Sequence, residues 1–149
     1  MYWNNEDRHE GELKNDKREG KGINFWPNGE RYEGNFKNGV FEGKGIYYWN
    51  NGDKYDGELK NGLYEGRGIF YFNNGNRYEG EFKYNKKEGK GIMYHSNGDR
   101  DMGDYLNDQK VGKHVLLTKF GILEQKYYQI INKIWKDKFK IIYWHFKYF

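Results

Sequence analysis

Residues 31–54, RYEGNFKNGVFEGKGIYYWNNGDK, carry the pattern from which the fold can be predicted. This stretch holds five glycines and six aromatic residues among many charges, which is typical of neither a helix nor an ordinary hydrophobic strand. The overlapping stretch KYDGELKNGLYEGRGIFYFNNGNR, residues 54–77, is nearly the same phrase. Self-similarity at a fixed spacing indicates a repeat architecture, in which each unit packs against its neighbours.

Glycines set the repeat length at 23 residues. Four series keep this spacing: Gly11, Gly34, Gly57, Gly80 and Gly103; Gly20, Gly43, Gly66, Gly89 and Gly112; Gly22, Gly45, Gly68 and Gly91; Gly29, Gly52, Gly75, Gly98 and Gly121. The last unit departs from the pattern, with Asp101 in a tyrosine position and His114 in a glycine position. We interpret it as a C-terminal cap, because the end units of repeat arrays are irregular.

Each unit is predicted to be a β-hairpin. YEGNF at 32–36 alternates aromatic or glycine with polar residues, and GKGIYYW at 43–49 is rich in aromatic and β-branched residues. The segment between them joins the strands, and NNGD at 50–53 carries the Asn-Gly pair that favours tight turns. The expected fold is an all-β repeat array, a single-layer twisted antiparallel meander of hairpins.

The glycines inside strands predict close approach of aromatic rings. We expect Tyr32, Tyr55 and Tyr78 to lie over glycines of adjacent strands. Phe36, Leu59 and Phe82 are expected to fill the same face, giving a thin core. His9 occupies the position that Tyr32 takes in the next unit, so we expect it to pack in the same way.

Charge separates the repeated region from the tail. Of 26 Lys and Arg and 22 Asp and Glu, residues 122–149 hold six Lys and two acids, which leaves 20 of each sign in residues 1–121. A neutral array lacks the basic footprint of a nucleic-acid-binding protein, so no nucleic acid is expected as a partner. The boundary predicts two parts, an array at 1–121 and a basic aromatic segment at 122–149.

The recurring pattern YEGxFKNGxxxGxGxxxxxNGxxY resembles the MORN repeat (membrane occupation and recognition nexus), over most of residues 1–121. The resemblance implies an elongated, twisted antiparallel sheet that serves as a scaffold. Similar arrays occur in ciliary radial-spoke heads, junctophilins, protist cytoskeletal proteins, plant phosphoinositide kinases and a lysine methyltransferase. The implied role is a cytoplasmic protein-interaction subunit of a ciliary-axonemal, radial-spoke-like or cytoskeletal assembly.

The array is expected to bind other protein subunits in a groove of the sheet. The predicted groove residues are Tyr32, Trp49, Tyr55, Phe72 and Tyr78, which would hold a helix or peptide of a partner.

No catalytic, cofactor-binding or metal-binding residues are predicted, and the chain is expected not to be an enzyme. Ser96 and Thr118 are its only Ser and Thr, it has no Cys, and its four His lack metal-ligand spacing. The repeated acids Glu33, Asp56 and Glu79 are expected to pair with bases across strands rather than to form an acid/base pair.

The segment after residue 121 is predicted to be helical from about 123 to 137. Three roles remain open: it caps the sheet, docks on a partner, or lies on a membrane surface as a basic aromatic anchor. The last role gives the alternative function, a peripheral adaptor that binds anionic phospholipid. The residues expected to cap or dock are Tyr127, Ile131, Ile134, Trp135 and Trp144.

Overall fold

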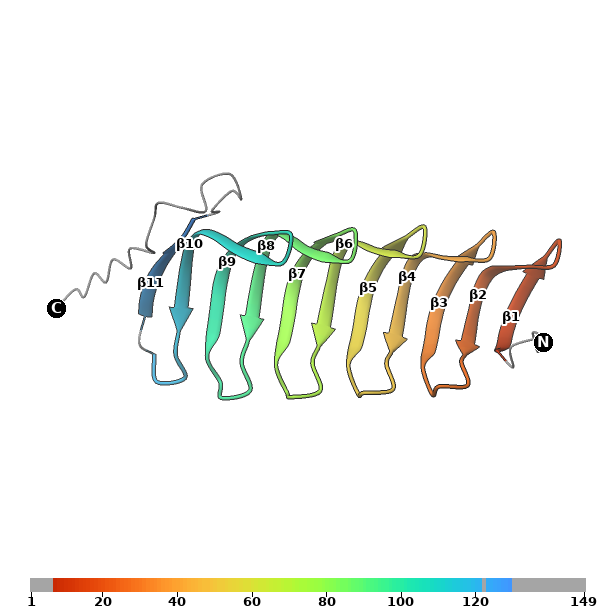
Figure 1. Ribbon diagram of the computed structural model, residues 1–149, viewed down its shortest axis with the longest axis horizontal. Coiled ribbons are helices and arrows are strands. Elements are labelled where there is room, and N and C mark those ends of the chain that lie inside the picture. The colour runs from red at the N-terminus through yellow and green to blue at the C-terminus, as the bar shows by residue number, and fades with distance from the viewer. Residues whose placement is uncertain (1–6, 122, 130–149) are drawn as a thin grey trace, which may run out of the picture.

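A computed structural model describes residues 7–121 and 123–129, which form one open antiparallel sheet of eleven strands (Figure 1). The strands lie side by side in chain order, so each strand pairs with the one before it and the one after it. This confirms the predicted single-layer meander. The strands are β1 (Arg8–Lys14), β2 (Lys17–Phe25), β3 (Arg31–Lys37), β4 (Val40–Tyr48), β5 (Lys54–Lys60), β6 (Leu63–Tyr71), β7 (Arg77–Lys83), β8 (Lys86–Tyr94), β9 (Arg100–Leu106), β10 (Gln109–Leu117) and β11 (Leu123–Tyr128).

Two-residue turns close the hairpins inside each unit. Between β3 and β4, Asn38 and Gly39 both have a positive φ, of 51° and 87°. Positive φ at both central positions defines the type I′ turn, whose twist matches that of the paired strands. The sequence placed the Asn-Gly turn signal at 50–53 instead, and that placement is wrong, because only Gly52 has a positive φ there, at 92°.

A longer loop connects successive hairpins. Residues 49–53 link β4 to β5, and Trp49 N–H donates to Asp53 O at 3.0 Å. The Asn51 side chain accepts from Asp53 N–H at 2.9 Å, which is the local bond that Asn makes in turns. Asn51 therefore stabilises this loop with a side-chain hydrogen bond, whereas Asn38 suits the tight turn because its backbone adopts a positive φ.

Glycines are needed inside the strands for two different reasons. Gly43 has a φ of 73° beside a register shift in the β3–β4 pairing, and that left-handed conformation disfavours other residues. Gly45 pairs with Gly34, and a Cβ on Gly34 would lie 2.5 Å from the Tyr32 hydroxyl. The tyrosine ring therefore lies directly on a patch of bare backbone, as predicted.

The core is one layer of rings on a single face of the sheet. Tyr32, Tyr55 and Tyr78 are completely buried, and Phe36, Leu59 and Phe82 fill the same face, as predicted. Offset and edge-to-face ring pairs add about 0.5–1.5 kcal/mol each to the burial of their area. His9 is buried against Phe36, with ring centroids 4.9 Å apart, and so packs in the tyrosine position as expected.

Adjacent hairpins are also joined at their turns. Gly39 N–H donates to Arg18 O at 2.9 Å, and Asn38 N–H donates to the Glu19 carboxylate at 2.9 Å. The same pair of bonds recurs one unit later, from Gly62 to Phe41 and from Asn61 to Glu42. Each turn is therefore held by the preceding hairpin.

Strand β11 continues the sheet beyond the repeats. Its residues 123–128 pair antiparallel with β10, so the predicted helix is wrong over this stretch. The rest of the predicted helix, residues 130–137, lies outside the described residues. Nowhere in the described ranges is there a helix with the length and hydropathy needed to cross a bilayer.

Candidate functional site: an aromatic groove

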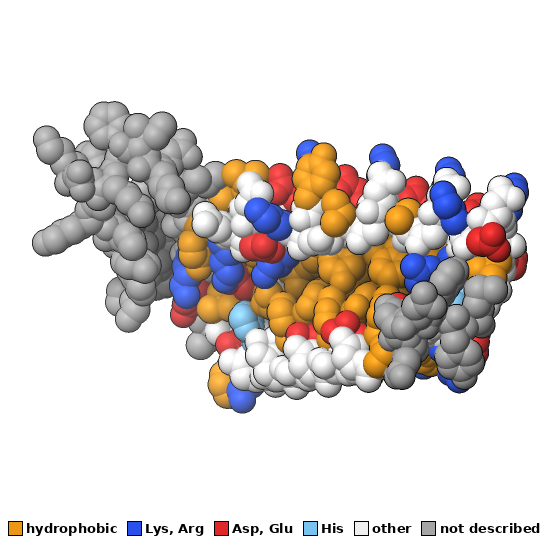
Figure 2. All heavy atoms as spheres, turned by 45° about the vertical axis from the view of Figure 1, so that its right-hand side comes forward, with side chains coloured by type: hydrophobic (Ala, Val, Ile, Leu, Met, Phe, Trp, Pro, Cys, Tyr) orange, Lys and Arg blue, Asp and Glu red, His pale blue; other side chains and the backbone are white. Residues whose placement is uncertain are grey.

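A hydrophobic trough, which we call the aromatic groove, runs across the strands on the face that carries the core. Figure 2 shows hydrophobic side chains gathered between two rims of polar and charged groups, with basic side chains towards the ends. The surface of the trough is a chain of half-buried rings in which each ring contacts the next, from Trp26 through Tyr47, Trp49 and Phe70 to Phe72. Centroid separations along this chain are 5.4, 4.7, 5.1 and 4.7 Å.

The five predicted groove residues divide between the floor and the surface of this trough. Trp49 and Phe72 are half-buried and pack on the core, so part of each ring faces solvent. Tyr32, Tyr55 and Tyr78 have no exposed area. They shape the groove from beneath and offer no surface of their own to a ligand.

The buried tyrosines are held by their hydroxyl groups. Each donates to the backbone carbonyl three residues later: Tyr32 to Asn35 O at 3.0 Å, and Tyr55 to Glu58 O at 2.8 Å. Burial raises the pKa of Tyr32 to about 12, although the hydrogen bond to Asn35 opposes this shift. The ring therefore stays a neutral donor at physiological pH.

Sequence reasoning missed the rings that cover these tyrosines. Phe41 stacks on Tyr32 with a centroid separation of 4.0 Å, and Tyr64 stacks on Tyr55 at 3.8 Å. Phe41 and Tyr64 are 23 residues apart, so the repeat register carried the signal. The sequence pattern assigns the segment containing Phe41 to the connection between two strands, and this assignment hides the inward orientation of its ring.

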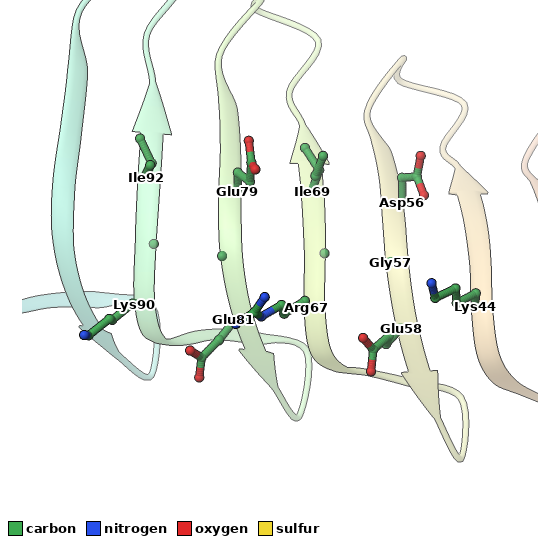
Figure 3. A pocket seen from close by; sticks show the side chains of 13 residues that line it. Lys44, Asp56, Gly57, Glu58, Arg67, Ile69, Glu79, Glu81, Lys90 and Ile92 are labelled. Carbon is green, nitrogen blue, oxygen red and sulfur yellow. The ribbon is translucent and has the colours of Figure 1, made fainter.

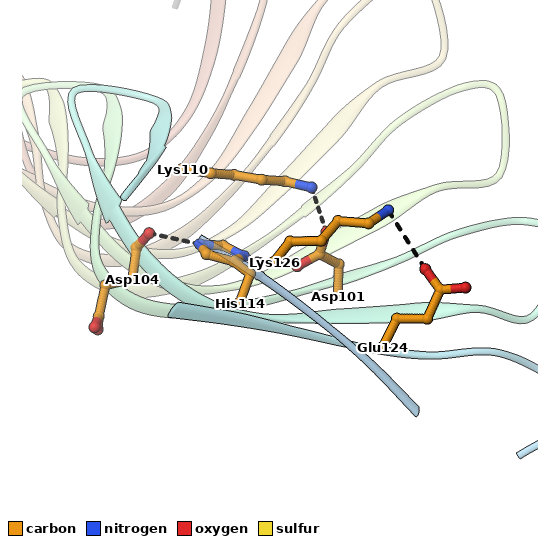
Figure 4. A network of polar contacts seen from close by, with 6 residues as sticks. All are labelled: Asp101, Asp104, Lys110, His114, Glu124 and Lys126. Atoms are coloured by element: carbon orange, nitrogen blue, oxygen red, sulfur yellow. Dashed lines mark hydrogen bonds and ion pairs between the residues drawn. The ribbon is translucent and has the colours of Figure 1, made fainter. Parts of the chain in front are cut away.

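The C-terminal unit replaces the tyrosine by a charged cluster (Figure 4). Asp101 takes the tyrosine position, and the His114 ring fills the space over Gly103 from the neighbouring strand. His114 Nδ1 lies 2.6 Å from the Asp101 carboxylate and Nε2 lies 2.8 Å from Asp104 O. Asp104 O corresponds to the carbonyl that each tyrosine hydroxyl reaches, so the histidine reproduces the tyrosine's hydrogen bond. Lys110 also pairs with Asp101.

The opposite face of the sheet carries a shallow charged trough of about 630 Å³ (Figure 3). Its bases and acids alternate along paired strands, with Lys44 opposite Glu58 and Arg67 opposite Glu81. Its residues are Lys44, Asp56, Gly57, Glu58, Arg67, Gly68, Ile69, Glu79, Gly80, Glu81, Lys90, Gly91 and Ile92. Charges of both signs interleave along it, which makes it a weaker candidate for binding than the aromatic groove.

The repeated acids on this face do not pair as predicted. Glu33 and Glu79 lie opposite Ile46 and Ile92 on the next strand. They pair instead with an arginine on their own strand, since Arg31 reaches Glu33 at 3.9 Å and Arg77 reaches Glu79 at 3.8 Å. Both pairs are exposed, and such pairs contribute little to stability.

Of the predicted tail residues, the structure places Tyr127, on β11 at the end of the sheet. Its side chain is 74% exposed. Ile131, Ile134, Trp135 and Trp144 lie outside the described residues. No group of three His, Asp or Glu side chains within 7–121 and 123–129 could hold a metal ion.

Comparison with known proteins agrees with the repeat register seen in the sheet. The MORN repeat family model matches four consecutive segments, residues 9–31, 32–54, 55–77 and 78–100. These segments account for more than half of the chain. A search of curated proteins found no match.

Proposed function

Because the chain belongs to the MORN-repeat family, we propose that it is a non-enzymatic scaffold whose aromatic groove binds a segment of a partner protein. MORN repeats are protein- or lipid-interaction modules in general. The observation that carries the proposal is the unbroken series of half-buried rings from Trp26 to Phe72. Contiguous apolar surfaces rimmed by polar groups mark binding sites in soluble proteins.

The groove suits an elongated ligand. It crosses strands that lie about 4.8 Å apart, so it follows the long axis of the sheet. Aromatic grooves of this form accept either the apolar face of a helix or an extended peptide. The ligand that we propose is one such segment of another subunit.

The test is photo-cross-linking from neighbouring positions on opposite faces. A photoreactive phenylalanine analogue at Phe72 faces the groove, whereas the same analogue at Tyr71 lies on the reverse face, where Lys54 covers the ring at 4.1 Å. We expect cross-links to a partner in native cells from position 72 and not from 71. Equal cross-linking from both positions would contradict binding in the groove.

We further propose that the assembly is ciliary-axonemal, radial-spoke-like, or cytoskeletal. Support comes from the range of assemblies in which arrays of this family occur, and it is therefore an analogy. Extraction of native cells with a mild non-ionic detergent tests it. Retention of the tagged protein in the insoluble pellet is expected, and release with the membrane fraction would contradict it.

A second candidate function is a peripheral membrane adaptor, favoured by the composition of residues 122–149. Six lysines and two acids accompany many aromatic and aliphatic residues there. Clustered lysines attract anionic lipid through an interaction that salt screens. Salt-sensitive binding to phosphatidylserine vesicles, lost when these lysines become glutamine, would support this function.

A further inference from the structure

One position in each unit decides what covers the buried tyrosine. We name it the stacking position; it is the second residue of each even-numbered strand from β2 to β10. In the middle of the sheet it is aromatic, as Phe41 and Tyr64. Towards both ends it is basic. The five residues in order are Arg18, Phe41, Tyr64, Lys87 and Lys110.

Two of the three bases already have polar partners within the sheet. Arg18 donates to the Asn24 side chain at 2.7 Å, and Lys110 pairs with Asp101. Lys87 differs, since among the described residues its ammonium group takes part in neither an ion pair nor a side-chain hydrogen bond, and only its backbone N–H donates one. Its ammonium group lies over three rings, 5.4 Å from the centroid of Tyr78, 5.7 Å from Tyr105 and 5.9 Å from Phe72.

The surroundings of Lys87 favour an anionic partner. Burial lowers its pKa, which the charge of Asp108 partly opposes. One oxygen of the Asp108 carboxylate accepts the backbone N–H of Lys87 at 2.8 Å, but among the described residues no ion pair joins that carboxylate to the Lys87 ammonium group. The Tyr105 ring beside Lys87 carries a buried hydroxyl that has no hydrogen-bond partner among the described residues.

We propose that the segment bound in the groove carries an acidic side chain that pairs with Lys87, next to apolar side chains that cover Phe41 and Tyr64. The inference rests on the proposed function of the groove and specifies the class and position of its ligand. A charged pair beside an apolar surface fixes where along the groove the ligand lies.

The sheet geometry sets the spacing between the acid and the apolar anchor. Adjacent stacking positions are two strands apart, about 9.6 Å. An extended peptide covers that distance in about three residues, and an α-helix covers it in about six or seven. The chain's own residues 130–149 are a poor match, because they hold five lysines and one aspartate.

The test is a peptide selection on the full-length protein. A phage-displayed library of random peptides of about twelve residues, enough to span several strands when extended, is selected on three proteins in parallel. These are the wild type, Lys87→Tyr and Lys90→Gln. Lys87→Tyr installs the residue found one unit earlier at Tyr64, so the fold should persist. Lys90 lies in the trough on the reverse face and is the matched control.

We expect wild type and Lys90→Gln to enrich peptides with Asp or Glu at a fixed spacing from an apolar anchor. Selection on the Lys87→Tyr variant should enrich peptides that carry the apolar anchor but no acidic residue at that spacing. Changing that acid to its amide should weaken a selected peptide about tenfold on the wild type and leave its affinity for Lys87→Tyr unchanged.

The outcomes separate this inference from the proposed function. Enrichment of apolar anchors without acids on the wild type would overturn the role of Lys87 and leave the groove as a binding site. The same acid preference on Lys87→Tyr would overturn it as well. Failure of the wild type to enrich any peptide would count against both the groove and its acidic ligand.

Discussion

At the scale of single residues, each unit depends on one tyrosine ring that lies over paired glycines. A Cβ on Gly68 would lie 2.5 Å from the Tyr55 hydroxyl and 2.7 Å from its Cε2 atom. We therefore expect Gly68→Ala to lower the free energy of unfolding by about 1–3 kcal/mol, the usual cost of overpacking. Urea denaturation followed by circular dichroism would measure the loss.

A double-mutant cycle with Tyr55→Ala identifies the cause. If the ring is what the new methyl group meets, adding Gly68→Ala to Tyr55→Ala should cost much less than adding it to the wild type. Strictly additive losses would mean that the glycine is required for another reason.

The charged cluster in the last unit makes a second residue-scale prediction. His114→Gly should leave the Asp101 carboxylate without its histidine partner, and Asp101→Tyr should bring a tyrosine into the space that the His114 ring occupies. Each single variant is expected to be less stable than the wild type by about 2 kcal/mol or more. The double variant restores the tyrosine-over-glycine pair of the other units and should recover most of the loss. A double variant less stable than both singles would contradict the exchange.

The same cluster gives a prediction on pH. Burial raises the pKa of Asp101, but hydrogen bonds from Lys110 and His114 outweigh it, so the folded-state pKa is below its ordinary value. The resulting stability is present above the unfolded pKa, about 3.9, and is lost as the pH falls through the folded pKa. Asp101→Asn lacks this titration, and its unfolding free energy should fall less than that of the wild type between pH 5 and pH 2. Parallel curves would contradict the assignment.

At the scale of the element, one hairpin turn contains a residue that disfavours the turn's conformation. Between β7 and β8, Tyr84 and Asn85 take the positions that Asn61 and Gly62 fill one unit earlier. Tyr84 has a φ of 52° and is 66% exposed, so it bears left-handed strain with little packing in return. Tyr84→Asn should raise the free energy of unfolding by about 1 kcal/mol. Tyr84→Ala, which keeps the strain and removes the ring, is the control and should not be stabilising.

For the individual strands and turns, the sequence predicted correctly those features that the pattern within one repeat determines. The position of Tyr32 over a glycine of the adjacent strand, and the packing of Phe36 on the same face, followed from the alternation within the strands and from the glycines inside them. The turn at Asn38 was misplaced because its unit holds two Asn-Gly pairs, at 38–39 and 51–52, and composition does not tell which pair has two positive φ angles. Pairing of Glu33 was misjudged because the strand bulge and the opposing Ile46 are set by tertiary register.

The helix expected from residue 123 failed for a different physical reason. Leu123 and Tyr127 lie four residues apart, a spacing that also suits a helical stripe. The free edge of β10 offers unpaired backbone N–H and C=O groups, and β11 satisfies them by pairing along its length. Likewise Lys87 could not be singled out as a groove residue before the register had placed it beside Tyr78.

At the scale of the whole molecule, the sheet is a one-dimensional array. Each strand pairs only with its sequence neighbours, and the turn bonds reach only the preceding hairpin. The stability of such an array is close to the sum of its units and of the interfaces between adjacent units. Length should therefore be adjustable in whole units, and the groove should lengthen or shorten with it.

Deleting residues 55–77 removes one matched repeat and joins Lys54 to Tyr78, which recreates the boundary between units. We expect this variant to fold, with the same circular dichroism signature per residue, a smaller denaturant m-value and a lower free energy of unfolding. Deleting residues 55–65 is the contrasting variant, because it removes most of β5 and the start of β6 and so puts the remaining strands out of register. It should fail to fold cooperatively. Equal stability of the two deletions would show that the register between units does not hold the sheet together. The expected difference in stability would show that the sheet, and with it the groove, is assembled from whole 23-residue units.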